Sequence, residues 1–566
     1  LDLIRKGLYS PRKNARNAKK ELGISDKVLD KMCRNMLTFN NLTSLKELNM
    51  LACATQETIV ERLPIGNLIL PVPDTDFREF LDEVDELSRF APKIIEAIEA
   101  DLDVNAREKK KLRIADRKFF DSLTSDMPDL HFEESELLAD ELELGVGRPR
   151  MSGELVYLFV MIRGFLGGSL ASKPSRRFLR ESMSLYAYLE KRELPMPGVT
   201  TILENVNLMS ANTLDLIFDE QIKFVLNEGL DDFSKLTIDS TSVKANSSWP
   251  TDATILTGLL MRAQRMGQKL HVFGLENFRQ GWVPRWLKEM DKLVFQICLV
   301  AGKANSKGKL KTRYRKVIRR GRKAANALTM ELNRLEQGLL METLAPSRRV
   351  LLQRVLDQLK TDLADANKVI EYANDRVFHD KTLPSKEKVL SLSDGSAAYI
   401  KKGSRNALIG YKPQLVRSDN GFVTSLIVPE GNAADSIELV PAIRDSIKRT
   451  GVVAELVSTD DGYASAKGRK EVLDMGVTDI SISGAKGKKL TGLDDWESEI
   501  YIGARRDRSA VESLMFTIKD GFEFGELGRR GIEAVRSELM EKVLAYNCCR
   551  IILMRKRRRE ALDKVA

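Results

Sequence analysis

The sequence predicts a multidomain protein of the α plus α/β class, in which a mixed sheet is interrupted by an all-helical insertion and preceded by helical domains. Three observations lead to this prediction. The chain has 566 residues, enough for three or four units that each bury a core. A strand-like segment, 234–239, stands before a long stretch with helical periodicity. Strand and helix patterns then alternate between residues 409 and 483, as they do in an α/β sheet.

The first part of the chain shows helical patterns. Residues 1–135 are expected to form a helical N-terminal region, to which we assign no chemistry. The turn GVGRPR then opens a second helical block, 145–231, whose short helices suggest a compact DNA-binding domain. Arg148 and Arg150 in that turn are candidate DNA contacts, because a Gly-Arg-Pro core can lie in a minor groove, although so short a motif more often only opens a domain.

A helical insertion, 251–389, is expected after the first strand, with long helices at 312–344 and 347–378. Within it, the segment 303–323 (KANSKGKLKTRYRKVIRRGRK) contains eleven basic residues and no acidic one. The alternative to binding is a solvated helix face or a flexible tail, but so many like charges repel one another unless an anion neutralises them. We therefore predict that this segment contacts DNA phosphates, and the candidate residues are Arg315, Lys316, Arg319 and Arg320.

The β signals resume with 409–416, and the turn SDNG before 422–428 predicts a hairpin. Pro413 lacks a ladder donor, so it should lie at a bulge or an edge. A helix, a strand, a helix, a strand and a helix are expected at 435–449, 452–459, 464–475, 477–483 and around 508–519. The sheet domain is therefore assigned to 232–250 together with 390–530, and a C-terminal helix to 531–566.

Composition excludes several kinds of chemistry. Five cysteines form no Cys-x-x-Cys pair, which argues against a disulfide framework or a zinc site. The three histidines are far apart in sequence, so any catalysis must depend on carboxylates. The net charge of +10 favours polyanionic partners. Neither a signal peptide nor an apolar run of membrane-spanning length is present, so a cytoplasmic, nucleoid-associated protein is expected.

Three acidic residues stand where catalysis could use them. Asp239 ends the first strand, Asp460 ends the strand 452–459, and Glu512 lies on the helix around 508–519. Taken singly each signal is weak, because an aspartate at a strand end is more often a turn former or a cap. On the late helix, Arg508, Glu512 and Lys519 share one side, together with Arg505 if the helix extends that far back. An apolar stripe adjoins them, so this charged set borders the core.

Five segments of the chain, in order, resemble the DDE transposases of bacterial insertion sequences. They are LTIDSTSVKANSSWPTD around Asp239, SLSDGSAAYIKKGSRNALIGYKPQLV followed by VPEGNAADS, STDDGYAS around Asp460, Arg508-x3-Glu512-x6-Lys519, and RRGIEAVRSELMEKVLAYNCCR. The resemblance covers residues 145–250 loosely and 390–555 closely. The tyrosine that commonly opens the Arg-Glu-Lys signature is Arg505 here, and the helical insertion lies between the first and second aspartates.

The resemblance implies a ribonuclease-H-like catalytic domain in which Asp239, Asp460 and Glu512 are catalytic and hold two Mg²⁺ ions, with Mn²⁺ as a substitute. It implies cleavage at transposon ends and strand transfer into target DNA. The expected partners are double-stranded DNA, as end repeats and target, and a second copy of the chain in a synaptic complex. Arg508 and Lys519 would clamp phosphates near the developing charge.

Two alternatives remain open at the level of sequence. One is a catalytically inactive DNA-binding protein on the same fold, and the other is a ribonuclease-H-like nuclease without strand transfer. A further choice concerns Asp460 and its neighbour Asp461, whose side chains point to opposite faces of the strand. The face of Asp461 includes Glu455, so we predict that the face of Asp460 is the more buried and that Asp460 holds metal. A strand that ended one residue later would exchange the two faces.

Overall fold

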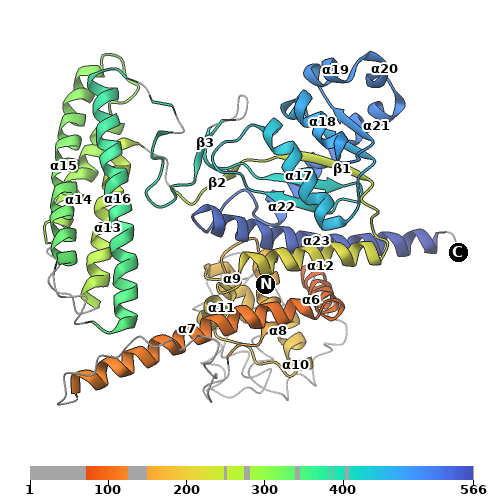
Figure 1. Cartoon of the computed structure of the whole chain (residues 1–566), viewed down its shortest axis with the longest axis horizontal. Coiled ribbons are helices and arrows are strands. Elements are labelled where there is room, and N and C mark those ends of the chain that lie inside the picture. The colour runs from red at the N-terminus through yellow and green to blue at the C-terminus, as the bar shows by residue number, and fades with distance from the viewer. Residues whose placement is uncertain are drawn as a thin grey trace, which may run out of the picture. The chain divides into compact units, whose positions relative to one another are not determined.

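The computed structural model describes the chain in several stretches, and Figure 1 shows the order of its elements. The chain divides into two units, Leu1–Thr75 and Asp76–Ala566, and almost all of the described residues belong to the second. Most of the predicted region 1–135, and also Arg148, lie outside the described residues. The described residues are 72–124, 150–247, 251–272, 281–337, 344–381, 383–384, 387–401 and 407–564.

Seven described helices precede the first strand. Helix α8 is mostly apolar, with Glu154 and Arg163 near its two ends, and eleven of its thirteen residues are buried. It packs against the long C-terminal helix α23 (Ile532–Asp563). At their contact Gly164 is required, because a Cβ there would lie 2.0 Å from the carbonyl oxygen of Glu541. The helices are α6 (Val72–Phe90), α7 (Lys93–Thr124), α8 (Gly153–Phe165), α9 (Lys173–Glu181), α10 (Met183–Lys191), α11 (Val199–Val206) and α12 (Ala211–Asn227).

The main sheet has five strands in the order β6-β5-β1-β7-β8. Strand β1 pairs antiparallel with β5 and parallel with β7, β5 and β6 form the predicted hairpin, and β7 is parallel to β8. The mixed sheet with added helical parts confirms the predicted class in its coarse form. The strands are β1 (Lys235–Ser240), β5 (Gln414–Ser418), β6 (Val423–Ile427), β7 (Leu456–Thr459) and β8 (Asp479–Ile482).

Both faces of this sheet are covered. One face shares a hydrophobic core with the N-terminal helices and α23. The other packs under α17 (Asp435–Thr450) and α18 (Ala466–Asp474) and forms a separate core. The central strands are therefore held on both sides, which fixes the residues at their ends.

The structure corrects the predicted strand 409–416. It is two strands in two sheets, since β4 (Leu408–Tyr411) joins β2 (Val243–Lys244) and β3 (Ala398–Ile400) in a small sheet, while β5 joins the main one. Pro413 stands between β4 and β5, where it has no ladder donor to lose, and its carbonyl oxygen accepts from the Thr241 N–H at 3.0 Å. The predicted strand 452–459 is also shorter than expected, because β7 begins at Leu456.

Four described helices lie between β2 and β3 in the chain and have a hydrophobic core of their own. They are α13 (Asp252–Val272), α14 (Val283–Cys298), α15 (Lys307–Gln337) and α16 (Pro346–Phe378). Helix α15 begins earlier than the predicted helix 312–344, and residues 338–343 of that prediction lie outside the described residues. Within the described stretches, no helix combines the length and the apolar character that a membrane span would need.

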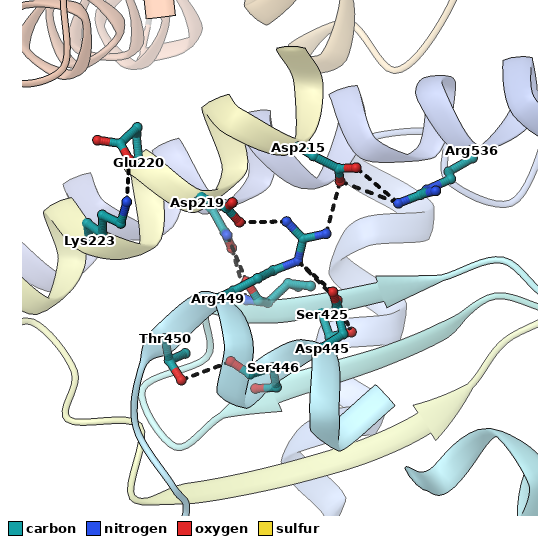
Figure 2. A network of polar contacts seen from close by, with 12 residues as sticks. Asp215, Asp219, Glu220, Lys223, Ser425, Asp445, Ser446, Arg449, Thr450 and Arg536 are labelled. Atoms are coloured by element: carbon teal, nitrogen blue, oxygen red, sulfur yellow. Dashed lines mark hydrogen bonds and ion pairs between the residues drawn. The ribbon is translucent and has the colours of Figure 1, made fainter. Parts of the chain in front are cut away.

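A polar network joins the N-terminal helices to the sheet domain (Figure 2). Its centre is Arg449 at the end of α17, a buried side chain that contacts carboxylates on two helices. Its guanidinium bonds Asp445 at 3.0 Å, Asp219 at 2.6 Å and Asp215 at 2.9 Å. From α23, Arg536 reaches the same Asp215 at 3.1 Å. Two arginines therefore face three carboxylates where α12 meets α17, and Arg449 contacts all three.

Replacing Arg449 with Met is expected to destabilise the chain by about 3 kcal/mol, because the three carboxylates then lose their shared cation. Their exposed fractions of 22–35% place the effect at the lower end for a buried ion pair. Urea unfolding measures it. Arg444→Met, an exposed position on the same helix, is the matched control and should change stability by less than about 0.5 kcal/mol. Equal effects of the two substitutions would contradict this role of Arg449.

Candidate active site

Two parallel strands carry the predicted aspartates to one edge of the sheet. The register pairs Thr237 of β1 with Ser458 of β7, and Asp239 and Asp460 each follow two residues later. Asp460 directly follows β7 and is still extended, with φ −88° and ψ 175°. Because parallel strands end at the same edge, the two aspartates are neighbours there.

Helix α22 (Ser509–Gly521) supplies the third carboxylate and packs beside β1. Val511, Leu514 and Ile518 are buried and anchor the helix, as the apolar stripe predicted. Glu512, on the same helix, has a side chain that is 71% exposed, and its Oε1 lies 3.8 Å from Arg508 Nη2. The helix does not extend back to Arg505, because a separate helix, α21 (Glu499–Asp507), precedes it. There the guanidinium of Arg505 stacks on the Trp496 ring at 4.1 Å.

These residues meet at one cavity of about 550 Å³, which we call the triad pocket. All three predicted carboxylates line it, together with the two predicted phosphate ligands of α22. They come from β1, from the turn after β7 and from α22, three places far apart in the sequence. The lining residues are Asp239, Ser240, Thr241, Ser242, Asp460, Arg508, Glu512, Met515, Phe516, Lys519 and Asp520.

Asp461 faces a different part of the structure. Its Oδ1 accepts hydrogen bonds from the N–H groups of Lys486 at 2.8 Å and Gly487 at 3.0 Å, at the start of α19 (Ala485–Thr491). Asp461 therefore caps a helix, while Asp460 lines the triad pocket. The predicted difference in burial between the two strand faces holds only before β7, where Val453 and Glu455 on the face assigned to Asp461 are exposed. Within β7 it fails, because Val457 and Thr459 on that same face are fully buried. Helices cover both faces of this central strand.

Comparison with known proteins identifies the region that holds two of these carboxylates. Residues 379–548 match the family model described as the transposase DDE domain. The chain carries a transposase DDE domain. A search of the curated proteins and a search of the solved structures each gave no match. The matched stretch includes Asp460 and Glu512, whereas Asp239 and the helices of the insertion precede it.

A buried hydrogen-bond network supports the two aspartates of the triad pocket from behind. The Tyr463 backbone N–H donates to the carbonyl oxygen of Asp460 at 3.2 Å. The Tyr463 hydroxyl donates to Gln414 Oε1, and Gln414 Nε2 donates to Asp435 Oδ1 at 3.1 Å. Lys412 Nζ lies 2.8 Å from the same oxygen of Asp435. Gln414 is also paired with Ser240, the residue after Asp239, so the network connects β1 with the turn that follows Asp460.

The charges of this network are fixed by its surroundings. Burial raises the pKa of Asp435, but the hydrogen bonds from Lys412 and Gln414 outweigh it and hold that pKa below the ordinary value. Burial, followed by the negative charges of Asp435, Asp239 and Asp460, raises the pKa of Tyr463 far above its usual range. Tyr463 therefore stays a neutral phenol that donates its proton to Gln414, and Asp435 stays ionised beside Lys412.

Sequence reasoning missed these supporting residues. Gln414 is a fully buried polar residue, and Tyr463 is fully buried too. The one available signal was a polar residue inside the apolar run LIGYKPQLV, since a buried polar side chain needs a partner. Its partners come from segments distant in sequence, which a local pattern does not reveal.

If Asp460 holds a Mg²⁺ ion and the chain cleaves DNA, replacing Tyr463 with Phe is expected to slow that cleavage by about tenfold to a hundredfold. It should also raise the Mg²⁺ concentration needed for half-maximal rate, because residues behind a metal ligand fix its orientation. Tyr546→Phe is the matched control. That tyrosine is also buried and donates its hydroxyl proton to the Gly421 carbonyl oxygen at 2.8 Å, but it lies outside the triad pocket and its network. Both variants should lose about 1 kcal/mol of stability. An unchanged Mg²⁺ requirement in Tyr463→Phe would show that the network has only a structural role.

The donor set of the triad pocket suits a hard divalent cation. Four carboxylates line it, the three predicted ones and Asp520, and neither cysteine nor histidine does, which favours Mg²⁺ or Mn²⁺ over zinc. Among the described residues, no three Asp, Glu, His or Cys side chains are gathered closely enough to form a metal cluster. Asp239 and Asp460 are neighbours at the ends of adjacent strands, and Glu512 and Asp520 stand on α22.

The predicted DNA contacts lie in two regions. Arg315, Lys316 and Arg319 are exposed on α15, whereas Arg320 is half-buried, pairs with Glu289 and stacks on Trp286 at 5.0 Å. A cavity of about 570 Å³ between α15 and the end of α16 includes Arg315, Arg319, Arg322 and Lys323 in its lining, and no acidic residue lines it.

Arg150, the described candidate in the N-terminal block, pairs with Glu99 and Asp103 of α7. A DNA contact by Arg150 would require both ion pairs to open. That contact therefore remains a prediction.

Proposed function

We propose that the chain is a DNA transposase that cleaves DNA at transposon ends in a metal-dependent reaction and transfers the freed strand into target DNA. The observation that carries this proposal is the triad pocket, which gathers Asp239, Asp460 and Glu512 with Arg508 and Lys519. The transposase DDE domain, matched over residues 379–548, supports it. A ribonuclease-H-like catalytic domain agrees with the mixed sheet, in which Asp239 lies near the end of β1 and Asp460 directly follows the neighbouring parallel strand β7.

The three carboxylates would hold two Mg²⁺ ions, with Mn²⁺ as a substitute. When bound, such a pair of ions supplies activation of the attacking hydroxyl and stabilisation of the leaving oxygen. Arg508 and Lys519 bind the phosphate oxygens and orient the phosphodiester for in-line attack. Water attacks first and frees a 3′-hydroxyl, and that hydroxyl then attacks the target phosphodiester. No protein nucleophile is needed, and a second copy of the chain would hold the other transposon end.

Incubation of the full chain with the DNA that flanks its gene, in Mg²⁺ buffer, tests this function. We expect end-specific cleavage and a joined product with a second duplex, and both should disappear with a chelator. Cleavage without joined product would reduce the function to that of a nuclease. Binding without any cleavage would make the chain a catalytically inactive DNA-binding protein.

We also propose that the helical insertion clamps DNA through α15. Replacing Arg315, Lys316, Arg319 and Arg320 with Gln should weaken binding to unrelated DNA sequences alike and flatten the dependence of affinity on salt. Each lost phosphate contact removes about one unit of slope. Because Glu289 already neutralises Arg320, the expected change is about three units and not four.

Fluorescence anisotropy over a series of salt concentrations measures this slope. A control variant replaces four exposed cations on α13 and α14 of the same insertion with Gln, and its slope should stay close to that of the wild type. If the dependence of affinity on salt has the same slope in the α15 variant as in the control variant, α15 faces away from DNA. The control positions are Lys269, Arg285, Lys288 and Lys292.

A further inference from the structure

A second cavity, of about 450 Å³, opens where the helical insertion joins the sheet domain, and we call it the junction pocket. One wall is a single face of α13, from Thr254 to Arg265. The opposite wall is formed by β2 and the loop after α22, whose backbones are hydrogen-bonded to each other. The Lys244 N–H donates to the Gly525 carbonyl oxygen at 2.9 Å, and the Leu527 N–H donates to that of Lys244 at 3.1 Å. This wall is therefore a fixed surface.

The lining of the junction pocket carries four cations and one carboxylate, Glu526. Lys244 forms an ion pair with Glu526 at 3.2 Å, and Arg262 forms one with Asp362 of α16. Arg530 Nε donates a hydrogen bond of 2.9 Å to the backbone carbonyl oxygen of Asn246, which carries no charge. Arg265 is exposed and forms no ion pair with any residue in the described ranges. Two positive charges are thus left for an anionic ligand.

The same lining offers apolar surface beside these cations. Met261 is 45% exposed between the turns that carry Thr254 and Arg265, and Ile255, Leu392 and Leu527 complete the apolar side. Serine hydroxyl groups at 391 and 393 lie among them. A ligand that suits this lining has an anionic part and a less polar part of comparable size, as a nucleotide has in its phosphate and its base.

The junction pocket and the triad pocket are consecutive along the same two segments. Ser242 lines the triad pocket and Asn246 lines the junction pocket, four residues later. On the other segment, Lys519 and Asp520 line the triad pocket and Glu526 lines the junction pocket. Four extended residues span at most about 14 Å. A DNA strand rises 3.4 Å per nucleotide, so this span corresponds to about four nucleotides.

We propose that the junction pocket is the subsite for the DNA strand beside the scissile phosphate, within about four nucleotides of the triad pocket. Arg265 and Arg530 bind its phosphates, and Met261 contacts a sugar or a base. The helical insertion then supplies one wall of the substrate site. This inference rests on the proposed function, because it takes the scissile phosphate to lie in the triad pocket.

Photo-cross-linking of the full chain to transposon-end duplexes tests the proposal. A 5-iodouracil is placed at successive positions on each side of the cleavage site, and the cross-linked peptides are identified by mass spectrometry. We expect positions within about four nucleotides of the cleavage site to cross-link to residues 254–265 or 526–530. Inorganic phosphate, added at the same concentration as the phosphate groups of the DNA, should not prevent these cross-links. Complete suppression by phosphate would reveal an anion site unrelated to DNA and would overturn the proposal.

Kinetics give the second readout. Replacement of Arg265 and Arg530 with Gln should raise the KM for DNA about tenfold or more, since each charge-assisted contact is lost. Replacement of Lys288 and Lys292, exposed cations of α14 outside the pocket, should leave KM unchanged. If the wild-type chain cleaves DNA while the nearby cross-links map elsewhere and the arginine variant keeps its KM, this proposal is overturned and the proposed function stands. If the wild-type chain does not cleave, both fail together.

Discussion

Replacing Asp239 with Asn, Asp460 with Asn, or Glu512 with Gln is expected to reduce Mg²⁺-dependent cleavage by at least about a hundredfold. Each substitution removes one anionic ligand from the triad pocket, and a catalytic metal contributes several kcal/mol to the stability of the transition state. Binding to DNA should change little, because affinity comes mostly from phosphate contacts outside the pocket. The three variants should therefore separate binding from catalysis.

Two measurements on the same preparations make this test sharp. Cleavage of labelled transposon-end DNA reports catalysis, and fluorescence anisotropy reports binding. Asp474→Asn, an exposed aspartate on α18 away from the pocket, is the charge-matched control and should cleave at the wild-type rate. If any one of the three variants cleaves at a rate near that of the wild type, its residue does not belong to a catalytic triad.

Asp460→Ala and Asp461→Ala are expected to differ widely, although the residues are neighbours. Asp460 lines the triad pocket, so its loss should abolish cleavage. Asp461 accepts two backbone hydrogen bonds at the start of α19, so its loss should cost about 0.5–2 kcal/mol of stability and leave most of the activity. Cleavage assays below the melting temperature of both variants separate the two effects. An inactive Asp461→Ala beside an active Asp460→Ala would exchange the two roles.

The parts of the fold that the sequence predicted well depend on local chemistry. The Asn-Gly turn fixed the hairpin between β5 and β6, since Gly421 adopts φ +91°, which suits glycine. Helical periodicity in the insertion predicted its long helices, because their apolar stripes form one core. Strand ends were less predictable. The predicted strand 409–416 is divided because β4 pairs with Val243 of β2, which is far away in the sequence.

In the candidate site, too, local motifs were predictable and contacts between distant segments were not. Asp239, Asp460 and Glu512 were chosen through motifs, and the structure places all three around one pocket. The supporting network of Tyr463 and Gln414 was not predicted, because it forms between β5, α17 and the turn after β7. Burial was a poor guide to the choice between Asp460 and its neighbour, since helices cover both faces of β7.

The most direct test of the central claim, that the three carboxylates form one divalent-metal site, does not require the recognised DNA sequence. Fe²⁺ replaces Mg²⁺ in the full chain, and with ascorbate and peroxide it generates radicals that cut the backbone next to the bound ion. We expect cuts near Asp239, Asp460 and Glu512 in the same experiment, all suppressed by excess Mg²⁺ and reduced together in Glu512→Gln. Cuts near only one of these segments, or cuts that Mg²⁺ does not suppress, would contradict a shared metal site in the triad pocket.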